Sequence, residues 1–179
     1  MEIKEKTKWV IDPGHSEIHF KVRHLVISTV TGGFDNFEGV VYSSSDDFSD
    51  AEVEFSADVE SINTNQHDRD NHLKSPDFFD AENHPKLTFR STGIKKKGKS
   101  EYILKGNLTI RGTTKEIELS VEHGGIIKDP WGNIKAGFEI TGKLNRKDYG
   151  LNWSAATETG GLVAADEVRL QIAIELTKK

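Results

Sequence analysis

Histidine and carboxylate side chains are the residues of this sequence that could bind a metal ion or move protons, and their spacing limits both kinds of chemistry. His67, His72 and His84 surround one polar segment, with Asp68 and Asp70 close by. On a helix, His67 and His72 would lie about 140° from each other, whereas two metal ligands on one helix face stand at i and i+4. The spacing therefore argues against a metal site in this segment.

A second pair of histidines and the lack of cysteine narrow the metal chemistry further. His15 and His19 would share one face of a strand at a separation of about 13 Å, which is too far for a single ion. The chain contains no cysteine, so a Cys-based zinc site, a catalytic thiol and a disulfide are excluded. We expect no bound metal.

An alternating apolar run begins at Ile18, and His24 is its last residue with a side chain predicted to face inward. A polar group in that position needs a hydrogen-bond partner or a ligand head group. A satisfied core histidine is the commoner explanation, and contact with a ligand is the alternative.

Motifs of hydrolases and nucleotide-binding proteins are missing. The sequence has no recognisable Gly-x-Ser-x-Gly elbow and no pair of carboxylates on a predicted inward face. The glycine pairs Gly32-Gly33 and Gly160-Gly161 lack the Lys-Ser/Thr of a P-loop and the strand-to-helix setting of a dinucleotide fingerprint. We expect no catalytic residue and no cofactor, and therefore no enzyme.

Composition excludes several partners. The chain has 29 acidic and 24 basic residues and a net charge of -5, with the basic residues scattered, so nucleic acid is not an expected partner. No run of about 18 apolar residues is present, which excludes a spanning helix. Charged residues crowd the first ten positions without an apolar run after them, so the given chain shows no signal peptide and is expected in the cytoplasm.

The elements that must position these side chains are predicted to be strands. Between Ala51 and Glu60, apolar and polar residues alternate at every position, which is the period of a strand with one buried face. The same alternation recurs from Ile18, through Phe34, Phe37 and Val40, and in five further segments, giving about eight strands. These further segments are 87–89, 102–110, 117–121, 134–144 and 168–176.

Turn residues and one polar segment divide the strands. Short gaps rich in Gly, Pro, Asp and Asn separate them, for example Asp12-Pro13-Gly14, and indicate antiparallel hairpins. Residues 64–79 break the alternation and read as a helical insertion that begins near Thr64 and Asn65 and stops at Pro76. No linker or repeat is visible, so we predict one domain over residues 8–177.

Periodicity alone leaves open whether the strands form a sandwich or a closed barrel. Closure removes exposed sheet edges, and eight strands enclose about enough space for one ligand. Small residues such as Gly106 and Ala136 among the large inward ones could leave a cavity. They could equally fit the taper of a filled barrel or mark bulges.

Several motifs, in order and at family spacing, resemble the YceI family of polyisoprenoid-binding proteins. They are Trp9-Val10-Ile11-Asp12 with His15-Ser16, Ile18-x-Phe20-x-Val22-x-His24, Ser61-Ile62-Asn63-Thr64, Arg69-Asp70-x-His72-Leu73-Lys74-Ser75, Asp77-Phe78-Phe79-Asp80, Gly106-x-Leu108-Thr109-Ile110-Arg111-Gly112 and Asn145-Arg146-x-Asp148-Tyr149-Gly150. The resemblance implies a lipocalin-like, extended, eight-stranded antiparallel β-barrel with a helix near its mouth. It also implies that the interior holds a polyprenyl chain, an isoprenoid quinone, a prenyl diphosphate, a fatty amide or another long-chain amphiphile.

Parity and the resemblance together select the candidate binding residues. Those expected to contact the tail are Phe20, Val22, Phe34, Phe55, Val59, Phe89, Leu108, Phe138 and Trp153. Those expected near the polar end are His24, Arg69, His72 and Arg146. An apolar tunnel gains roughly 0.8 kcal/mol per buried methylene against a cost of about 4 to 15 kcal/mol for association, which favours a long chain over a small metabolite.

Two other functions remain open on the sequence. A filled barrel could act as an interaction module, and a lipid-acting hydrolase could use His24 as its base. Relatives in the family often form homodimers, so a homodimer is an expected partner alongside the lipid. Storage, transport or a stress response are the processes that the resemblance suggests.

Overall fold

The computed structural model describes residues 5–153 and 164–179. Alternating residues form the strands, because successive side chains of a strand point to opposite faces. The strands are β1 Thr7–Ile11, β2 Glu17–His24, β3 Ser28–Phe34, β4 Phe37–Ser43, β5 Glu52–Asp58, β6 Ile62–Asn63, β7 Lys86–Lys96, β8 Glu101–Ile110, β9 Thr113–Lys128, β10 Ile134–Asn145 and β11 Ala164–Lys178. The helices are α1 His67–Lys74 and three 3₁₀ turns, η1 Pro13–His15, η2 Val59–Ser61 and η3 Arg146–Tyr149.

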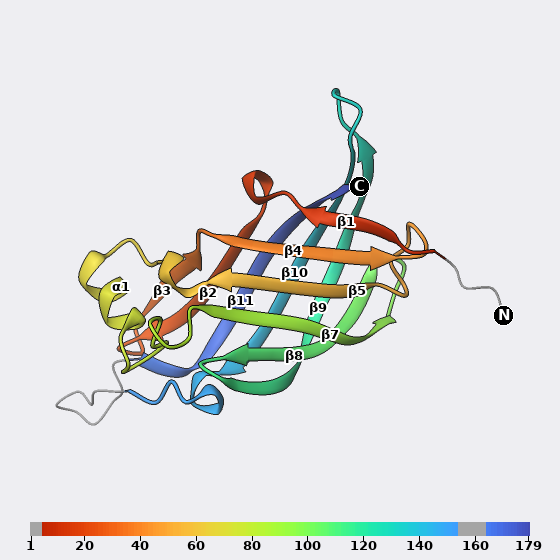
Figure 1. The fold of residues 1–179 in the computed structure, drawn as a ribbon. Coiled ribbons are helices and arrows are strands. Elements are labelled where there is room, and N and C mark those ends of the chain that lie inside the picture. The colour runs from red at the N-terminus through yellow and green to blue at the C-terminus, as the bar shows by residue number, and fades with distance from the viewer. Residues whose placement is uncertain (1–4, 154–163) are drawn as a thin grey trace.

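Eight of these strands form a closed antiparallel barrel (Figure 1). Their order around the ring is β1, β4, β5, β7, β8, β9, β10 and β11, and β11 closes the ring by pairing with β1. The earlier part of β11 pairs instead with β2, from which β3 and β6 continue the sheet. The predicted fold class, an extended eight-stranded antiparallel barrel with a helical insertion within 64–79, is confirmed.

One predicted strand is wrong. The sequence predicts a single strand through Phe34, Phe37 and Val40, but β3 ends at Phe34 and β4 begins at Phe37. The turn between them breaks the period, so Val41 is buried inside the barrel while Val40 lies on the other face, opposite Val10 and Glu54. The alternation between inward and outward side chains holds within a single strand, and a turn can change which positions face inward.

The end of the barrel that holds β1 is closed by a loop. Phe48, in the loop between β4 and β5, is buried with its ring centroid 5.2 Å from that of Trp9 and 4.9 Å from that of Phe138. The Tyr102 hydroxyl donates a hydrogen bond to the backbone carbonyl of Asp47 and so ties the loop to β8. This end carries a packed aromatic plug.

The opposite end is covered by α1 and the segment that follows it. The helix itself is polar and buries none of its residues completely. After it, the chain turns inward and brings Phe78 and Phe79 over the barrel, with Arg111 donating a hydrogen bond of 2.9 Å to the Phe78 carbonyl. We call α1 together with residues 75–84 the lid.

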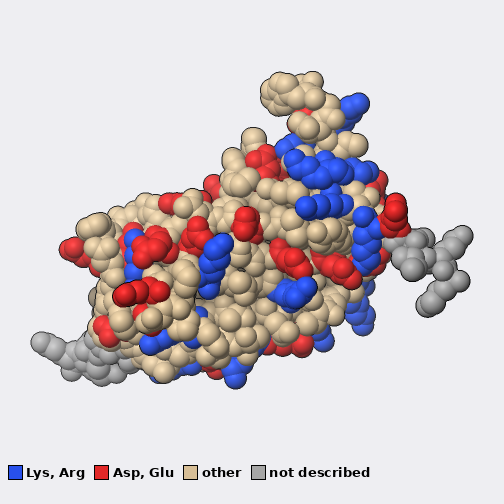
Figure 2. Space-filling view, viewed as in Figure 1, with Lys and Arg blue, Asp and Glu red and all other residues tan. Residues whose placement is uncertain are grey.

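Charged side chains cover the outside of the barrel. Figure 2 shows acidic and basic groups mixed over most of one face, with basic groups gathered near the ends of β1 and β11. Lys8, Lys178 and Lys179 lie there, since Lys178 pairs with Trp9 and the Lys179 amide donates to the Lys8 carbonyl. Among the described residues, none of the helices combines the length and the apolar character that crossing a membrane requires.

Candidate ligand-binding site

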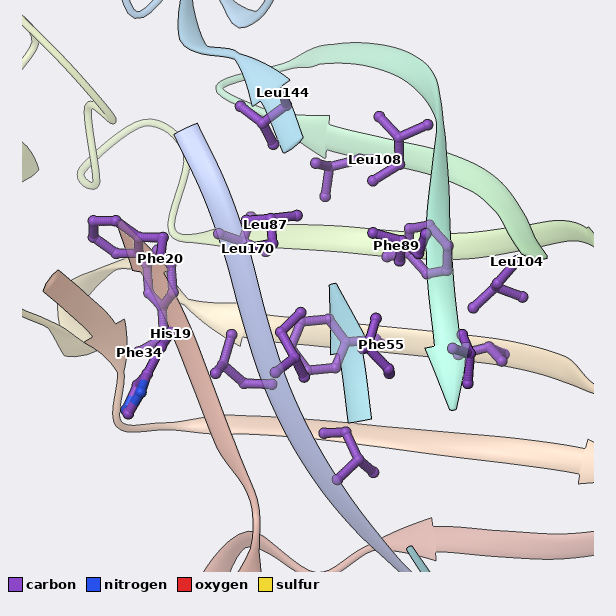
Figure 3. A pocket seen from close by; sticks show the side chains of 18 of the residues that line it. His19, Phe20, Phe34, Phe55, Leu87, Phe89, Leu104, Leu108, Leu144 and Leu170 are labelled. Atoms are coloured by element: carbon purple, nitrogen blue, oxygen red, sulfur yellow. The ribbon is translucent and has the colours of Figure 1, made fainter. Parts of the chain in front are cut away.

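A cavity of about 250 Å³ lies inside the barrel, between the Phe48 plug and the lid. Figure 3 shows phenylalanine and leucine side chains from several strands converging around this space, among them Phe55, Phe89, Leu104 and Leu170. Apart from His19, Tyr102 and Arg146, every side chain of residues 5–153 and 164–179 that lines it is apolar. Such a lining favours a hydrocarbon chain over a polar metabolite.

The inward glycines do not produce this cavity by leaving holes. A Cβ atom on Gly106 would collide with the Phe89 ring, and one on Gly32 would collide with the Phe20 ring. The missing side chain of each glycine thus leaves room for the aromatic ring of a residue on the neighbouring strand. Gly93 differs, because it lies at a register shift between β7 and β8 and marks a bulge.

Among the described residues, Arg146 is the one fully charged group at the cavity wall, and only 4% of it is exposed. Its guanidinium donates hydrogen bonds to the carbonyls of Ala165 (3.0 Å), Leu151 (2.6 Å) and Trp153 (2.7 Å). Burial lowers the pKa of Arg146, and the nearby Asp166 carboxylate opposes this effect. The sequence position of Arg146, at the start of η3 directly after β10, holds it between β10 and β11.

One edge of the guanidinium lacks a partner within the described part of the chain. Arg146 Nη2 and Asp166 Oδ1 are 3.6 Å apart, which is an ion pair without a hydrogen bond. Both atoms are buried and neither has a hydrogen-bond partner. Buried polar atoms of this kind are rare in native proteins and call for a partner. The site therefore offers one donor and one acceptor beside an apolar cavity.

Most residues predicted to contact the tail do line the cavity, whereas two do not. Val59 is buried in η2 and lies outside the lining. Trp153 also lies outside it, with its ring packed edge-on against His72 at 4.6 Å between centroids. The residues that line the cavity as predicted are Phe20, Val22, Phe34, Phe55, Phe89, Leu108 and Phe138.

Of the residues predicted near the polar end, only Arg146 reaches the cavity. Arg69 instead donates to the hydroxyl (2.8 Å) and carbonyl (2.7 Å) of Thr64, at the start of the lid. His72 Nε2 lies 2.9 Å from Asp77 Oδ2 within the lid. His24 is half-buried at the end of β2, where it lies opposite Ser28 of β3. It does not line the cavity. Local hydrogen bonds thus occupy Arg69 and His72.

Sequence reasoning missed the lid as part of the lining. Leu73, Phe78 and Phe79 come from the helical insertion and contact the cavity, as does Leu151 after η3. The adjacent aromatic pair Phe78-Phe79 in an otherwise polar segment is the signal that could have indicated this. Strand parity could not, because these residues belong to no strand.

The barrel wall is split between β9 and β10 near the lid. The two strands pair from Ile134 opposite Lys128 up to Thr141 opposite Ser120, and no further. Beyond that point an outer groove of about 1180 Å³ lies over the split. Leu144, Leu170 and Ile117 line both this groove and the cavity, so one layer of side chains separates the two spaces.

Tyr149 also lines the outer groove. It is buried, and its hydroxyl lacks a hydrogen-bond partner in the described part of the chain. Burial raises the pKa of Tyr149 to about 12, so the hydroxyl stays protonated at neutral pH and can donate a hydrogen bond.

One group of possible metal ligands is present within residues 5–153 and 164–179. Asp12, His15 and Glu175 place their ligand atoms within 4.8 Å of one another. However, the Lys135 ammonium lies 3.1 Å from Asp12 Oδ2 and 3.8 Å from Glu175 Oε1. A lysine cation therefore occupies the place that a metal ion would take.

Comparisons with known proteins agree with this geometry. A family model described as the YceI-like domain matches residues 9–176. A UPF0312 protein of Staphylococcus aureus is 38% identical over 172 residues, which is 96% of this chain and 98% of the relative. The crystal structure of the Campylobacter jejuni YceI protein matches with a TM-score of 0.73 and 32% identity, covering 88% of this chain and 90% of that one.

Two more distant structures share the fold. Burkholderia cenocepacia BcnA has a TM-score of 0.80 at 20% identity and covers 92% of this chain and 98% of its own. A polyisoprenoid binding domain from Saccharophagus degradans, implicated in plant cell wall breakdown, has a TM-score of 0.66 at 14% identity and covers 96% of this chain and 98% of its own. The chain, with its closed barrel, apolar interior and family match over nearly its whole length, belongs to the YceI-like family.

Proposed function

We propose that this protein binds one long-chain amphiphile, such as an isoprenoid or a fatty amide, with the tail inside the barrel and the head group at Arg146. The observation that carries this proposal is the cavity, whose lining is apolar except at a few points, with one buried guanidinium at its wall. The Saccharophagus degradans domain, which is named for binding polyisoprenoids, shares the fold and supports the same class of ligand.

A long tail requires the cavity to widen. Pockets that hold drug-sized ligands measure about 300–1,000 Å³, and this cavity of about 250 Å³ is slightly smaller. The lid is the element best suited to move, because α1 buries none of its residues completely and is held largely by local hydrogen bonds. We expect Phe78 and Phe79 to shift outward when a ligand enters.

The charges at the polar end favour a neutral head group. Asp166 already balances the buried Arg146, so a diphosphate would bring excess negative charge into a site of low polarity. A quinone carbonyl, an amide or an alcohol would instead accept a hydrogen bond from Arg146 Nη2, which lacks one among the described residues. We therefore rank an isoprenoid quinone or a fatty amide above a prenyl diphosphate.

Several finer points belong to the same proposal. We propose that the protein is a carrier or store in the cytoplasm, that it uses no cofactor besides the lipid, and that it is not an enzyme. The family and fold indicate a binding protein in general. The possible homodimer is checked by sedimentation of the purified chain, with and without ligand.

The decisive experiment is to denature the purified protein, extract it with organic solvent and identify the extract by mass spectrometry. A stoichiometric long-chain compound supports the proposal. The ligand-free protein is then titrated with an isoprenoid quinone, and we expect its thermal midpoint to rise with quinone concentration because only the folded state binds. An empty extract with no rise in the midpoint favours the filled-barrel alternative.

A matched pair of variants places the ligand inside the barrel. Leu104 lines the cavity, and its neighbour Ile103 faces the outer groove. We expect Leu104→Trp to weaken quinone binding at least tenfold because it fills the cavity, and Ile103→Trp to leave binding unchanged. If Leu104→Trp does not fold, Phe55→Ala takes its place as the test variant. We expect this change to weaken quinone binding because it removes an aromatic contact from the cavity lining. Equal effects at 103 and 104 would contradict interior binding.

A further inference from the structure

The hairpin between β2 and β3 carries three consecutive aliphatic residues in contact with solvent. Leu25, Val26 and Ile27 form its tip and are 39%, 71% and 83% exposed. On either side, His24 pairs with Ser28, so the tip is a short, ordered turn at the end of two paired strands. Single exposed apolar residues are common on protein surfaces, whereas three adjacent ones at a projecting turn mark an interaction site.

The backbone of this turn does not favour the residues it contains. Leu25 has a φ of 52° and Val26 a φ of 66°, both in the left-handed region. Asn and Gly are the residues that adopt this region readily, and a β-branched residue such as Val is strongly disfavoured there. Val26 therefore gains little burial and no backbone stability in the isolated protein, and Leu25 offsets the same backbone cost by partial burial only. Local rules broken in this way are typical of functional sites.

The tip stands beside the end of the cavity that the lid covers. His24 pairs with Ala164 at the start of β11, and the next pair inward, Val22 with Val168, lines the cavity. In Figure 1, β2, β3 and α1 lie at the same end of the barrel, away from the projecting β9–β10 hairpin. On β2, the last residue that lines the cavity, Val22, is therefore only three positions from Leu25, the first residue of the exposed apolar tip.

The charges of the hairpin differ from those of the whole chain. Between residues 18 and 34 there is no acidic residue, although the chain has a net charge of -5. The charged residues of this segment are Lys21 and the exposed Arg23, and Arg169 of β11 lies opposite Lys21. An apolar tip with cations behind it matches a bilayer that contains acidic lipids.

We propose that the Leu25–Ile27 tip inserts into the surface of a lipid bilayer that contains acidic phospholipids. Insertion brings the lidded end of the barrel against the membrane, where the ligand enters or leaves the cavity. The inference rests on the proposed function for the ligand, while the docking of the tip is measured independently of it. The protein would bind such a membrane peripherally and reversibly.

The rival surface is the tip of the β9–β10 hairpin. Trp131 is 83% exposed there, and Lys8, Lys178 and Lys179 lie near the same end of the barrel. That end is closed by the Phe48 plug, so a membrane held there would not border the cavity. Trp131→Ser is therefore the control variant for the β2–β3 tip.

The experiment uses vesicles of equal parts phosphatidylcholine and phosphatidylglycerol and measures co-sedimentation of the full chain. The test variant is Leu25→Asn with Val26→Gly, which introduces the residues that a left-handed turn prefers, so its thermal midpoint should equal or exceed that of the wild type. We expect its vesicle binding to fall about tenfold. Arg23→Gln should weaken binding less, and added salt should weaken the wild type.

A second readout follows the transfer of an isoprenoid quinone from the same vesicles to the protein. We expect the Leu25→Asn, Val26→Gly variant to extract quinone about tenfold more slowly, while quinone added in detergent binds with unchanged affinity. Unchanged vesicle binding in this variant, or an equal loss in Trp131→Ser, overturns the docking proposal. Failure of the wild type to bind quinone in detergent would overturn the proposed function, and vesicle binding would still decide the docking.

Discussion

Arg146 shows how one buried residue can serve the fold and the binding site at once. Its guanidinium ties together the carbonyls of Leu151, Trp153 and Ala165, which lie on both sides of residues 154–163. Its remaining nitrogen, Nη2, lies 3.6 Å from Asp166 Oδ1, and the residue also lines the cavity. Arginine suits this position because its planar group offers several donors in fixed directions.

Replacing Arg146 should be far more costly than replacing its neighbour. Arg146→Met leaves the carbonyls of Leu151, Trp153 and Ala165 without their donor and removes one of the two cations beside Asp166, the other being Lys147 at 3.4 Å. We therefore expect a loss of about 3–5 kcal/mol in the free energy of unfolding. Lys147→Met is the control, since Lys147 is exposed and makes only a partly exposed ion pair with Asp166, and this change should cost less than about 1 kcal/mol. Both are measured by urea denaturation. A loss below about 1 kcal/mol for Arg146→Met would show that the guanidinium is not structural.

At the scale of elements, the two ends of the barrel are closed in different ways. The loop between β4 and β5 places Phe48 among Trp9, His123 and Phe138 as a packed plug. The lid at the other end consists of a polar helix with no completely buried residue, followed by Phe78 and Phe79, which pack over the cavity. Helix α1 therefore contributes few buried apolar contacts, which favours opening at this end.

The plug loop should respond to acid through Asp47. Hydrogen bonds from the Ser45 hydroxyl and from the Ser49 amide and hydroxyl lower the pKa of Asp47 to about 2, from an ordinary value of 3.8. A lowered pKa means that the ionised carboxylate stabilises the fold fully above pH 3.8, and that this contribution disappears as the pH falls through about 2.

The test compares Asp47→Asn with the wild type as a function of pH. At neutral pH we expect the variant to be less stable by at most about 1 kcal/mol, because the carboxylate is half exposed. The difference should shrink between pH 3.8 and about 2. Asp46→Asn, which removes no side-chain hydrogen bond within the described part of the chain, should show no such trend. A constant difference across this range would contradict the assignment.

For the whole molecule, closure of the ring depends on the last residues of β11. Ile11 pairs with Leu176, and the same Leu176 pairs with Ala136 of β10 on its other side. Leu176 is almost fully buried. The barrel therefore joins segments that are distant in sequence, which makes its unfolding cooperative and its folding slow.

Truncation should show this dependence directly. Deleting residues 175–179 removes the pairing of β1 with β11, and we expect a loss of more than about 3 kcal/mol together with loss of hydrogen-exchange protection in β1 and β4. Deleting only Lys179, which lies beyond the end of β11, removes one backbone hydrogen bond to Lys8 and leaves the pairs from Trp9 to Ile11 in place. This shorter deletion should change the stability and the hydrogen-exchange protection far less. If the shorter deletion is as damaging as the longer one, closure is not the cause.

Much of the site was predictable, and the misses have a common origin. Strand parity predicts that Phe20, Phe55 and Phe89 face inward, and they line the cavity, because inside one strand the direction of a side chain depends only on its position. Arg69 and His72 do not line the cavity and instead contact local partners in the lid. Phe78 and Phe79 were missed because the lid contributes them from outside any strand.

The order of polar and apolar residues by itself determined most of the antiparallel strands, the helical insertion and the apolar character of the interior. These depend on periodicity and turn residues, which are local. Only the tertiary structure decided that the ring closes through β1 and β11, that Phe48 plugs one end, and that Arg146 is the charged residue at the cavity. Each of these depends on strand register and on contacts between residues far apart in the chain, and no local pattern records them.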